Sequence, residues 1–69
     1  MKHKQMYVRL LGEVKYARHF TKGKWYPVTN CLSNCGYIVD DNGYTYLLDL
    51  DLIRSKMASW NYREVDIIL

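Results

Sequence analysis

FTKGKWYPVTNCLSNCGYIVDDNGYTYLLD, residues 20–49, is the stretch of this chain that decides the fold. Within it, residues 37–40 and 44–48 are rich in aromatic and β-branched side chains, which suit the pleated, half-buried surface of a strand. Asp41-Asn42-Gly43 lies between these two runs, and an Asn-Gly pair in that position is a strong signal for a tight hairpin. We therefore predict a β-hairpin over residues 37–48, with Gly43 at positive φ in its turn.

Residues 24–29, Lys-Trp-Tyr-Pro-Val-Thr, form a further predicted strand, because they too combine aromatic and β-branched side chains. Lys22-Gly23 just before it is a turn signal, since glycine adopts positive φ without strain. Pro27 has no N–H to donate to a sheet, which predicts an edge position or a bulge at that point. The polar and small residues 30–36 are expected to form a loop between this strand and the hairpin.

Towards the N-terminus, residues 6–11 alternate as a strand does, with Val8 and Leu10 on one side. Residues 1–5 are a basic tip that we expect to fray. Residues 13–20 are ambiguous: we favour a strand or an extended loop, and a helical turn is the alternative.

Towards the C-terminus, residues 49–54 are expected to form one helical turn, with Asp49 or Asp51 capping its first N–H groups. Residues 55–59 are a connection. Residues 60–69 read as one or two strands.

The same stretch resembles a pattern found in small proteins of phages and prophages, in which a GKxYxV segment precedes an IxDDxG hairpin. It covers about half of the chain, and its motifs are structural rather than catalytic. The resemblance implies an SH3-like β-barrel of about five strands, with a short 3₁₀ turn before the last strand. Together with the strand pattern it predicts an all-β fold over residues 1–69. The matching positions are Phe20, Gly23, Lys24, Tyr26, Val28, Ile38, Asp40, Asp41 and Gly43.

With 69 residues the chain has room for one domain, and a domain this small buries only about 60% of its unfolded surface. A deep catalytic cleft is not expected at this size. No window holds the roughly 18 apolar residues that a membrane helix requires, and Arg9 interrupts the short apolar run near the N-terminus, so no signal peptide is predicted. We therefore expect a cytoplasmic protein, and the host cytoplasm if a phage encodes it.

Charge is unevenly distributed along the chain. Residues 1–24 carry seven Lys and Arg against one acidic residue, whereas residues 25–69 carry three against six. The basic N-terminal third is expected to face an acidic surface on a partner.

Cys31 and Cys35 form a single Cys-x-x-x-Cys pair, whereas a structural zinc site needs four ligands. His3 and His19 would have to complete the set, and their spacing matches no zinc pattern. Neither cysteine has a basic neighbour in sequence that would activate a thiol. We expect two ordinary reduced cysteines in a loop, and no metal or cofactor.

The acidic residues do not indicate catalysis either. Asp40 and Asp41 are consecutive on a predicted strand end, so their side chains should point to opposite faces. Lys22-Gly23-Lys24 lacks the first glycine, the Ser or Thr and the helix of a phosphate-binding loop. The sequence therefore predicts a protein that is not an enzyme.

One group of residues does suggest binding. Cations interleaved with an aromatic ring can hold phosphates while the ring stacks on a base, or they can form a protein contact, where Trp, Tyr and Arg dominate. The alternative is that the tryptophan packs under a loop and the lysines only solvate the surface. The residues concerned are Arg18, His19, Lys22, Lys24 and Trp25.

Seven tyrosines and two tryptophans exceed what so small a core can hide. Tyr44, Trp60 and Tyr62 are the expected surface aromatics, and we include them in the predicted binding set. The alternative is that they pack against neighbouring strands with their polar atoms satisfied.

The end of the chain is unusually apolar, with Val65, Ile67, Ile68 and Leu69. A strand that is apolar on both faces is normally covered on both. We expect this segment either to meet a second copy, as a homodimer, or the target, or to fold back over its own domain.

These observations together predict a non-enzymatic phage or prophage accessory protein that binds a host protein and modulates or inhibits it. The alternative is a small nucleic-acid-binding β-barrel that uses the basic N-terminal half.

Overall fold

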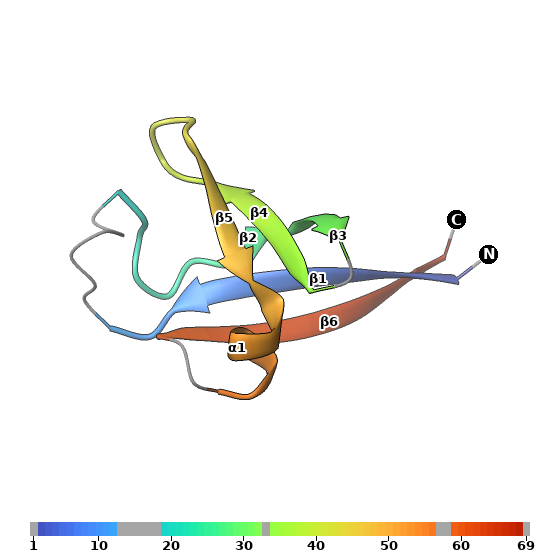
Figure 1. Cartoon of the computed structure of the whole chain (residues 1–69). Coiled ribbons are helices and arrows are strands. Elements are labelled where there is room, and N and C mark those ends of the chain that lie inside the picture. Colours follow the sequence, from blue (N-terminus) through green and yellow to red (C-terminus); the bar gives the residue numbers. More distant parts are fainter. Residues whose placement is uncertain (1, 13–18, 33, 57–58, 69) are drawn as a thin grey trace.

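The computed structural model describes residues 2–12, 19–32, 34–56 and 59–68. In these ranges the chain forms two three-stranded antiparallel sheets and one short helix, so the predicted small all-β fold is confirmed (Figure 1). Sheet A has the order β2-β1-β6 and sheet B the order β3-β4-β5. The elements are β1 (Lys2–Leu10), β2 (Tyr26–Pro27), β3 (Thr29–Leu32), β4 (Cys35–Val39), β5 (Thr45–Asp49), α1 (Leu50–Arg54) and β6 (Trp60–Ile68).

The two sheets do not close into a barrel, and that part of the prediction is wrong. The chain leaves sheet A at Pro27 and enters sheet B at Thr29, so Val28 is the crossing point. Closure requires every strand to have a neighbour on both sides, whereas β2, β3, β5 and β6 each lie at the end of a sheet. Pro27 does lie on an edge strand, as its missing N–H predicted.

The hairpin of β4 and β5 is confirmed. Gly43 has a φ of 89°, and its N–H donates to Asp40 O at 3.1 Å. Asp40 stabilises the same turn with its side chain, because its Oδ1 accepts from the N–H groups of Asn42 at 2.9 Å and of Tyr44 at 2.8 Å. This is the side-chain-to-backbone bonding that makes aspartate a turn residue.

Two segments are more ordered than predicted. The expected loop at residues 30–36 is largely strand, because β3 runs on to Leu32 and β4 already begins at Cys35, with a register shift between Asn30 and Leu32. The tip expected to fray is also paired, since Lys2 lies opposite Ile68. In both segments strand pairing satisfies backbone groups that a loop would leave unpaired: β3 pairs with its sequence neighbour β4, whereas Lys2 pairs with the distant strand β6.

The predicted helical turn before the last strand is present, but it is an α-helix rather than a 3₁₀ turn. Ser55 N donates to Asp51 O at 3.0 Å, which is the i to i−4 bond of an α-helix. Asp49 is the N-cap, as predicted, and its Oδ1 accepts from the N–H groups of Asp51 at 3.0 Å and Leu52 at 3.3 Å.

Phe20 lies at the centre of an aromatic cluster in the core. Its ring meets those of Tyr26, Tyr46 and Trp60 edge-on, at centroid distances of 5.0, 5.0 and 5.2 Å. The buried aliphatic residues alternate along β1: Val8 and Leu10 share one side, as predicted, and this side faces the core. The apolar core comprises Met6, Val8, Leu10, Phe20, Tyr26, Val28, Ile38, Leu48, Leu50, Ile53 and Trp60. Most of residues 13–20, where strand, loop and helical turn were weighed, lie outside the described residues.

Candidate binding surface on sheet A

The outer face of sheet A carries a group of cationic and aromatic side chains. Alternation along β1 buries Val8 and Leu10, so Tyr7 and Arg9 point away from the core. The register places Arg63 of β6 directly opposite Tyr7, on this same outer face. Trp25 precedes β2, which pairs with β1 on the other side.

These side chains are stacked on one another. The guanidinium carbon of Arg9 lies 4.8 Å from the ring centre of Trp25, and that of Arg63 lies 4.5 Å from it. Arg63 is also 5.6 Å from the ring centre of Tyr7. Cations at these distances are attracted by the negative face of an aromatic ring. We call Tyr7, Arg9, Trp25 and Arg63 the arginine–tryptophan face.

Neither guanidinium of this face has a carboxylate partner within the described part of the chain. Arg9 is half-buried, and its Nε is buried without a hydrogen-bond partner there. Arginine stays charged under all ordinary conditions and binds carboxylates and phosphates through paired N–H groups. The arrangement therefore presents two positioned positive charges that can receive an anionic group.

The predicted basic group around Trp25 is divided in the structure. Lys24 Nζ lies 3.3 Å from Asp41 Oδ1, and His19 Nδ1 lies 3.0 Å from Asn42 Nδ2, so both contact the β4–β5 turn. Lys22 is exposed. Arg18 lies outside the described residues. Among the residues that the structure describes, the cations on the Trp25 ring are instead Arg9 and Arg63.

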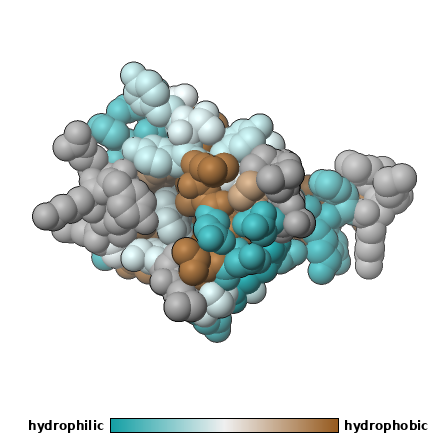
Figure 2. Space-filling view, in the orientation of Figure 1, coloured by the Kyte–Doolittle hydropathy of each residue, from teal (hydrophilic) through white to brown (hydrophobic). Residues whose placement is uncertain are grey.

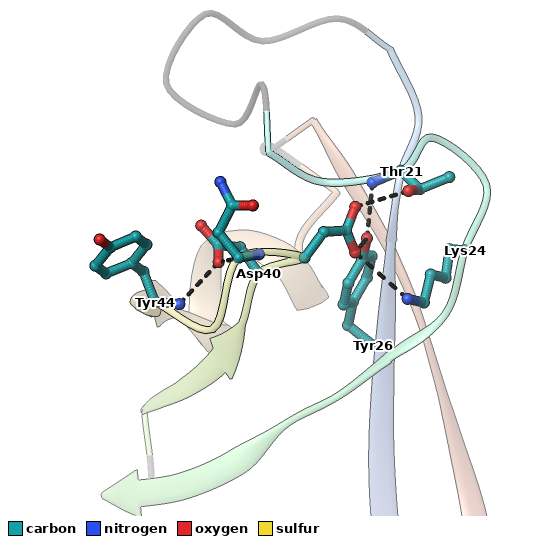
Figure 3. Close-up of polar contacts among 7 residues, drawn as sticks. Thr21, Lys24, Tyr26, Asp40 and Tyr44 are labelled. Atoms are coloured by element: carbon teal, nitrogen blue, oxygen red, sulfur yellow. Dashed lines mark hydrogen bonds and ion pairs between the residues drawn. The ribbon is translucent and has the colours of Figure 1, made fainter.

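Asp41 is the centre of the contact between the 19–24 segment and that turn, and Figure 3 shows its partners Thr21, Lys24 and Tyr26. Its Oδ2 accepts from Thr21 Oγ1 at 2.7 Å, and its Oδ1 accepts from the Tyr26 hydroxyl at 2.8 Å. The hydrogen bond from Thr21, then that from Tyr26, and the charge of Lys24 lower the pKa of Asp41 below its ordinary value. Among the described residues, the Asp40 side chain accepts hydrogen bonds from its own turn (Figure 3), whereas Asp41 accepts from the 19–26 segment, so the two carboxylates have different partners.

Of the three aromatics expected on the surface, one is largely exposed. Tyr44 is 69% exposed beside the β4–β5 turn. Trp60 is only 4% exposed and belongs to the core, so that prediction is wrong: its register opposite Leu10 turns it inward. Tyr62 is half-buried against the core.

Exposed apolar side chains gather elsewhere too. Figure 2 shows hydrophobic groups over β5 and α1 among hydrophilic ones, and Leu47 and Leu52 are exposed there.

Arg9 and Arg63 were not among the binding residues predicted from the sequence. The alternation of Arg9 with Val8 and Leu10 already indicated that Arg9 faces outward. No local signal joins Arg63 to it, because they are 54 positions apart in the chain and only the β1–β6 register brings them to one face.

Other kinds of site are not apparent in the described residues. No three His, Cys, Asp or Glu side chains there lie close enough together to hold a metal ion. Cys35 is half-buried at the start of β4, and the side chain of Cys31 lies outside the description. Within the same ranges, no helix has the length and apolar content needed to cross a bilayer. No protein-family model, characterised protein or solved structure matches the chain.

Proposed function

We propose that this chain is a non-enzymatic binding module whose arginine–tryptophan face grips a partner protein. The observation that carries the proposal is the pair of guanidiniums, Arg9 and Arg63, on one indole ring without a carboxylate partner among the described residues. Arg, Trp and Tyr are the residues that most often dominate protein interfaces. The site combines all three on one side of a regular sheet.

The partner surface that fits this face is acidic. A carboxylate can take two parallel N–H bonds from a guanidinium, and the stacking on Trp25 holds both arginines before the partner arrives. Side chains that are already ordered lose less conformational entropy on binding. The basic excess of residues 1–24 would also speed the encounter with an acidic partner.

Nucleic-acid binding is the second candidate, because phosphates fit the same guanidiniums. Single-stranded nucleic acid is gripped mainly by bases that stack on open aromatic rings. Trp25 is half-buried and already stacks with two arginines. This occupied ring favours the carboxylates of a protein over bases.

We further propose, from the GKxYxV and IxDDxG resemblance, a phage or prophage accessory protein that modulates or inhibits a host protein in the host cytoplasm. From the same resemblance we propose that the fold is SH3-like, in an open form that is not a closed barrel. Two features support that proposal: the chain crosses between sheets at Val28, and a helical turn, α1, directly precedes the last strand.

Affinity capture from bacterial lysate tests the proposed function, and the critical variant is Arg63→Ala. We expect the intact chain to retain a specific protein, nuclease treatment to leave that capture unchanged, and Arg63→Ala to lose it by about tenfold or more, as a central interface arginine does. Arg54→Ala is the matched control, because Arg54 is an exposed arginine on α1, away from this face. Capture that disappears with nuclease would point to nucleic acid, and equal loss in both variants would contradict the assigned surface.

A further inference from the structure

β1 and β6 form a long two-stranded arm. Their register runs without a shift from Lys2 opposite Ile68 to Leu10 opposite Trp60. The pair continues past sheet B towards both ends of the chain (Figure 1) and makes a narrow projection in the space-filling view (Figure 2). β6 is the last strand of sheet A, so one of its long sides has no neighbouring strand in the described chain.

The register shows which main-chain groups lie on that open side. Met6 O accepts from Val28 N at 2.9 Å, so the even-numbered residues of β1 direct their main-chain groups towards β2 and the odd-numbered ones towards β6. Arg63, opposite Tyr7, therefore bonds to β1. Its neighbours Tyr62 and Glu64 direct their N–H and C=O groups away from the sheet.

This edge carries the charged residues Arg63, Glu64 and Asp66, but it lacks two other devices that protect an edge strand. β6 contains no proline, and its ladder with β1 contains no bulge. Val65 is 41% exposed and Ile68 80% exposed. A long, regular edge with exposed apolar side chains is a template for another strand.

A second copy of the chain fits this edge poorly in the registers that are centred on its carboxylates. Glu64 and Asp66 lie on the same face of β6, two positions apart. If two β6 strands paired antiparallel about Glu64, Val65 or Asp66, carboxylates would lie directly opposite one another, which is destabilising. In these three registers charge disfavours the homodimer that the apolar terminus suggested.

We propose that an extended segment of the partner protein adds to β6 as a fourth strand of sheet A, along residues 63–68. Arg63, Val65 and Ile67 share the outer face, and Arg63 has no carboxylate partner in the described chain. The segment therefore carries an acidic residue opposite Arg63 and apolar residues two and four positions from it. The inference rests on the proposed function in assigning Arg63 to the partner, and it adds the binding mode and the sequence pattern.

Two capped peptides test this proposal by NMR titration of the ¹⁵N-labelled chain. One is Thr-Val-Thr-Val-Thr-Glu-Thr, and the other has Lys in place of Glu. We expect the Glu peptide to shift the amides of Tyr62, Glu64 and Ile68 saturably, and the Lys peptide to bind at least about tenfold more weakly.

Glu64→Pro separates strand addition from other contacts. The Glu64 N–H faces the open side, so proline removes a donor to the peptide and leaves the β1 ladder intact, as edge strands tolerate. Glu64→Thr is the matched control, because it also loses the carboxylate but keeps the N–H. We expect about tenfold weaker peptide binding for Glu64→Pro than for Glu64→Thr, with both variants folded by their NMR spectra.

Three results would overturn strand addition. The first is equal binding of the Glu and Lys peptides, and the second is the absence of chemical-shift changes in the β6 amides at about 1 mM peptide. The third is equal peptide affinity of Glu64→Pro and Glu64→Thr. Strand addition would also be overturned by shifts of the β6 amides that depend on protein concentration and accompany a doubled mass in light scattering, since a second copy would then occupy the edge. If Arg63→Ala abolishes capture of the lysate protein and Glu64→Pro does not, the proposed function stands and this inference fails.

Discussion

At the scale of single residues, Asp41 shows how one side chain positions a loop. Its carboxylate receives hydrogen bonds from Thr21 and Tyr26 and contacts Lys24. Its own N–H donates to His19 O at 3.0 Å. The segment that leads into Trp25 is therefore attached to the β4–β5 turn at several points, which helps to hold Trp25 in place beside sheet A.

The lowered pKa of Asp41 gives this contact a defined pH dependence. A carboxyl with a lower pKa in the folded state stabilises the fold above its unfolded pKa of about 3.9, and the contribution is lost as pH falls through the folded value. We expect Asp41→Asn to lower the melting temperature at pH 7 and to show a shallower loss of stability than the natural chain between about pH 5 and pH 2.

Thr21→Val removes the hydrogen bond that lowers the pKa of Asp41 most. Its loss of stability with falling pH should therefore be intermediate between those of the natural chain and Asp41→Asn. Thermal melts of the three chains across this range measure the effect. Identical slopes for the natural chain and Asp41→Asn would show that the contact does not contribute.

At the scale of elements, the β4–β5 hairpin depends on backbone conformation at one position. Gly43 has a φ of 89°, whereas Gly12 does not lie at positive φ, and an added Cβ at either position would meet nothing within 4 Å. Comparing the two glycines therefore isolates the cost of the left-handed conformation from steric contact.

We expect Gly43→Ala to lower the free energy of unfolding by about 1 kcal/mol, because an L residue is strained at that φ. Gly12→Ala should be neutral or stabilise by up to about 1 kcal/mol, since alanine restricts the unfolded chain. Urea denaturation of both variants measures the difference. A neutral Gly43→Ala would argue against this turn geometry.

At the scale of the whole molecule, one aromatic cluster links distant parts of the chain. Phe20 contacts Tyr26 and Trp60 of sheet A and Tyr46 of sheet B. A domain of 69 residues has a small stability margin, so loss of one large member of its core should unfold much of the population.

We expect Trp60→Ala to cost about 3–5 kcal/mol, as truncation of a buried aromatic does. Tyr44→Ala is the control, because Tyr44 is exposed, and it should stay within about 0.5 kcal/mol of the natural chain. Circular dichroism and chemical denaturation report both. A folded Trp60→Ala chain of near-normal stability would contradict the core position of this residue.

The sequence by itself determined the elements whose signals are local. Gly43 and Asp40 act through their own turn, Asp49 caps the helix that follows it, and Val8 alternates with its neighbours on one strand. Each depends on backbone dihedrals or hydrogen bonds within a few residues, which composition and spacing record directly.

The tertiary structure alone decided what depends on pairing between distant strands. The β1–β6 register ordered Lys2 and its neighbours, turned Trp60 into the core and placed Arg63 beside Arg9 on Trp25. A shift of that register by one residue would reverse the face of every side chain on β6. The sequence near Arg63 does not indicate that Arg63 shares a face with Arg9, because pairing with β1, a strand more than fifty positions away, decides which residues share that face.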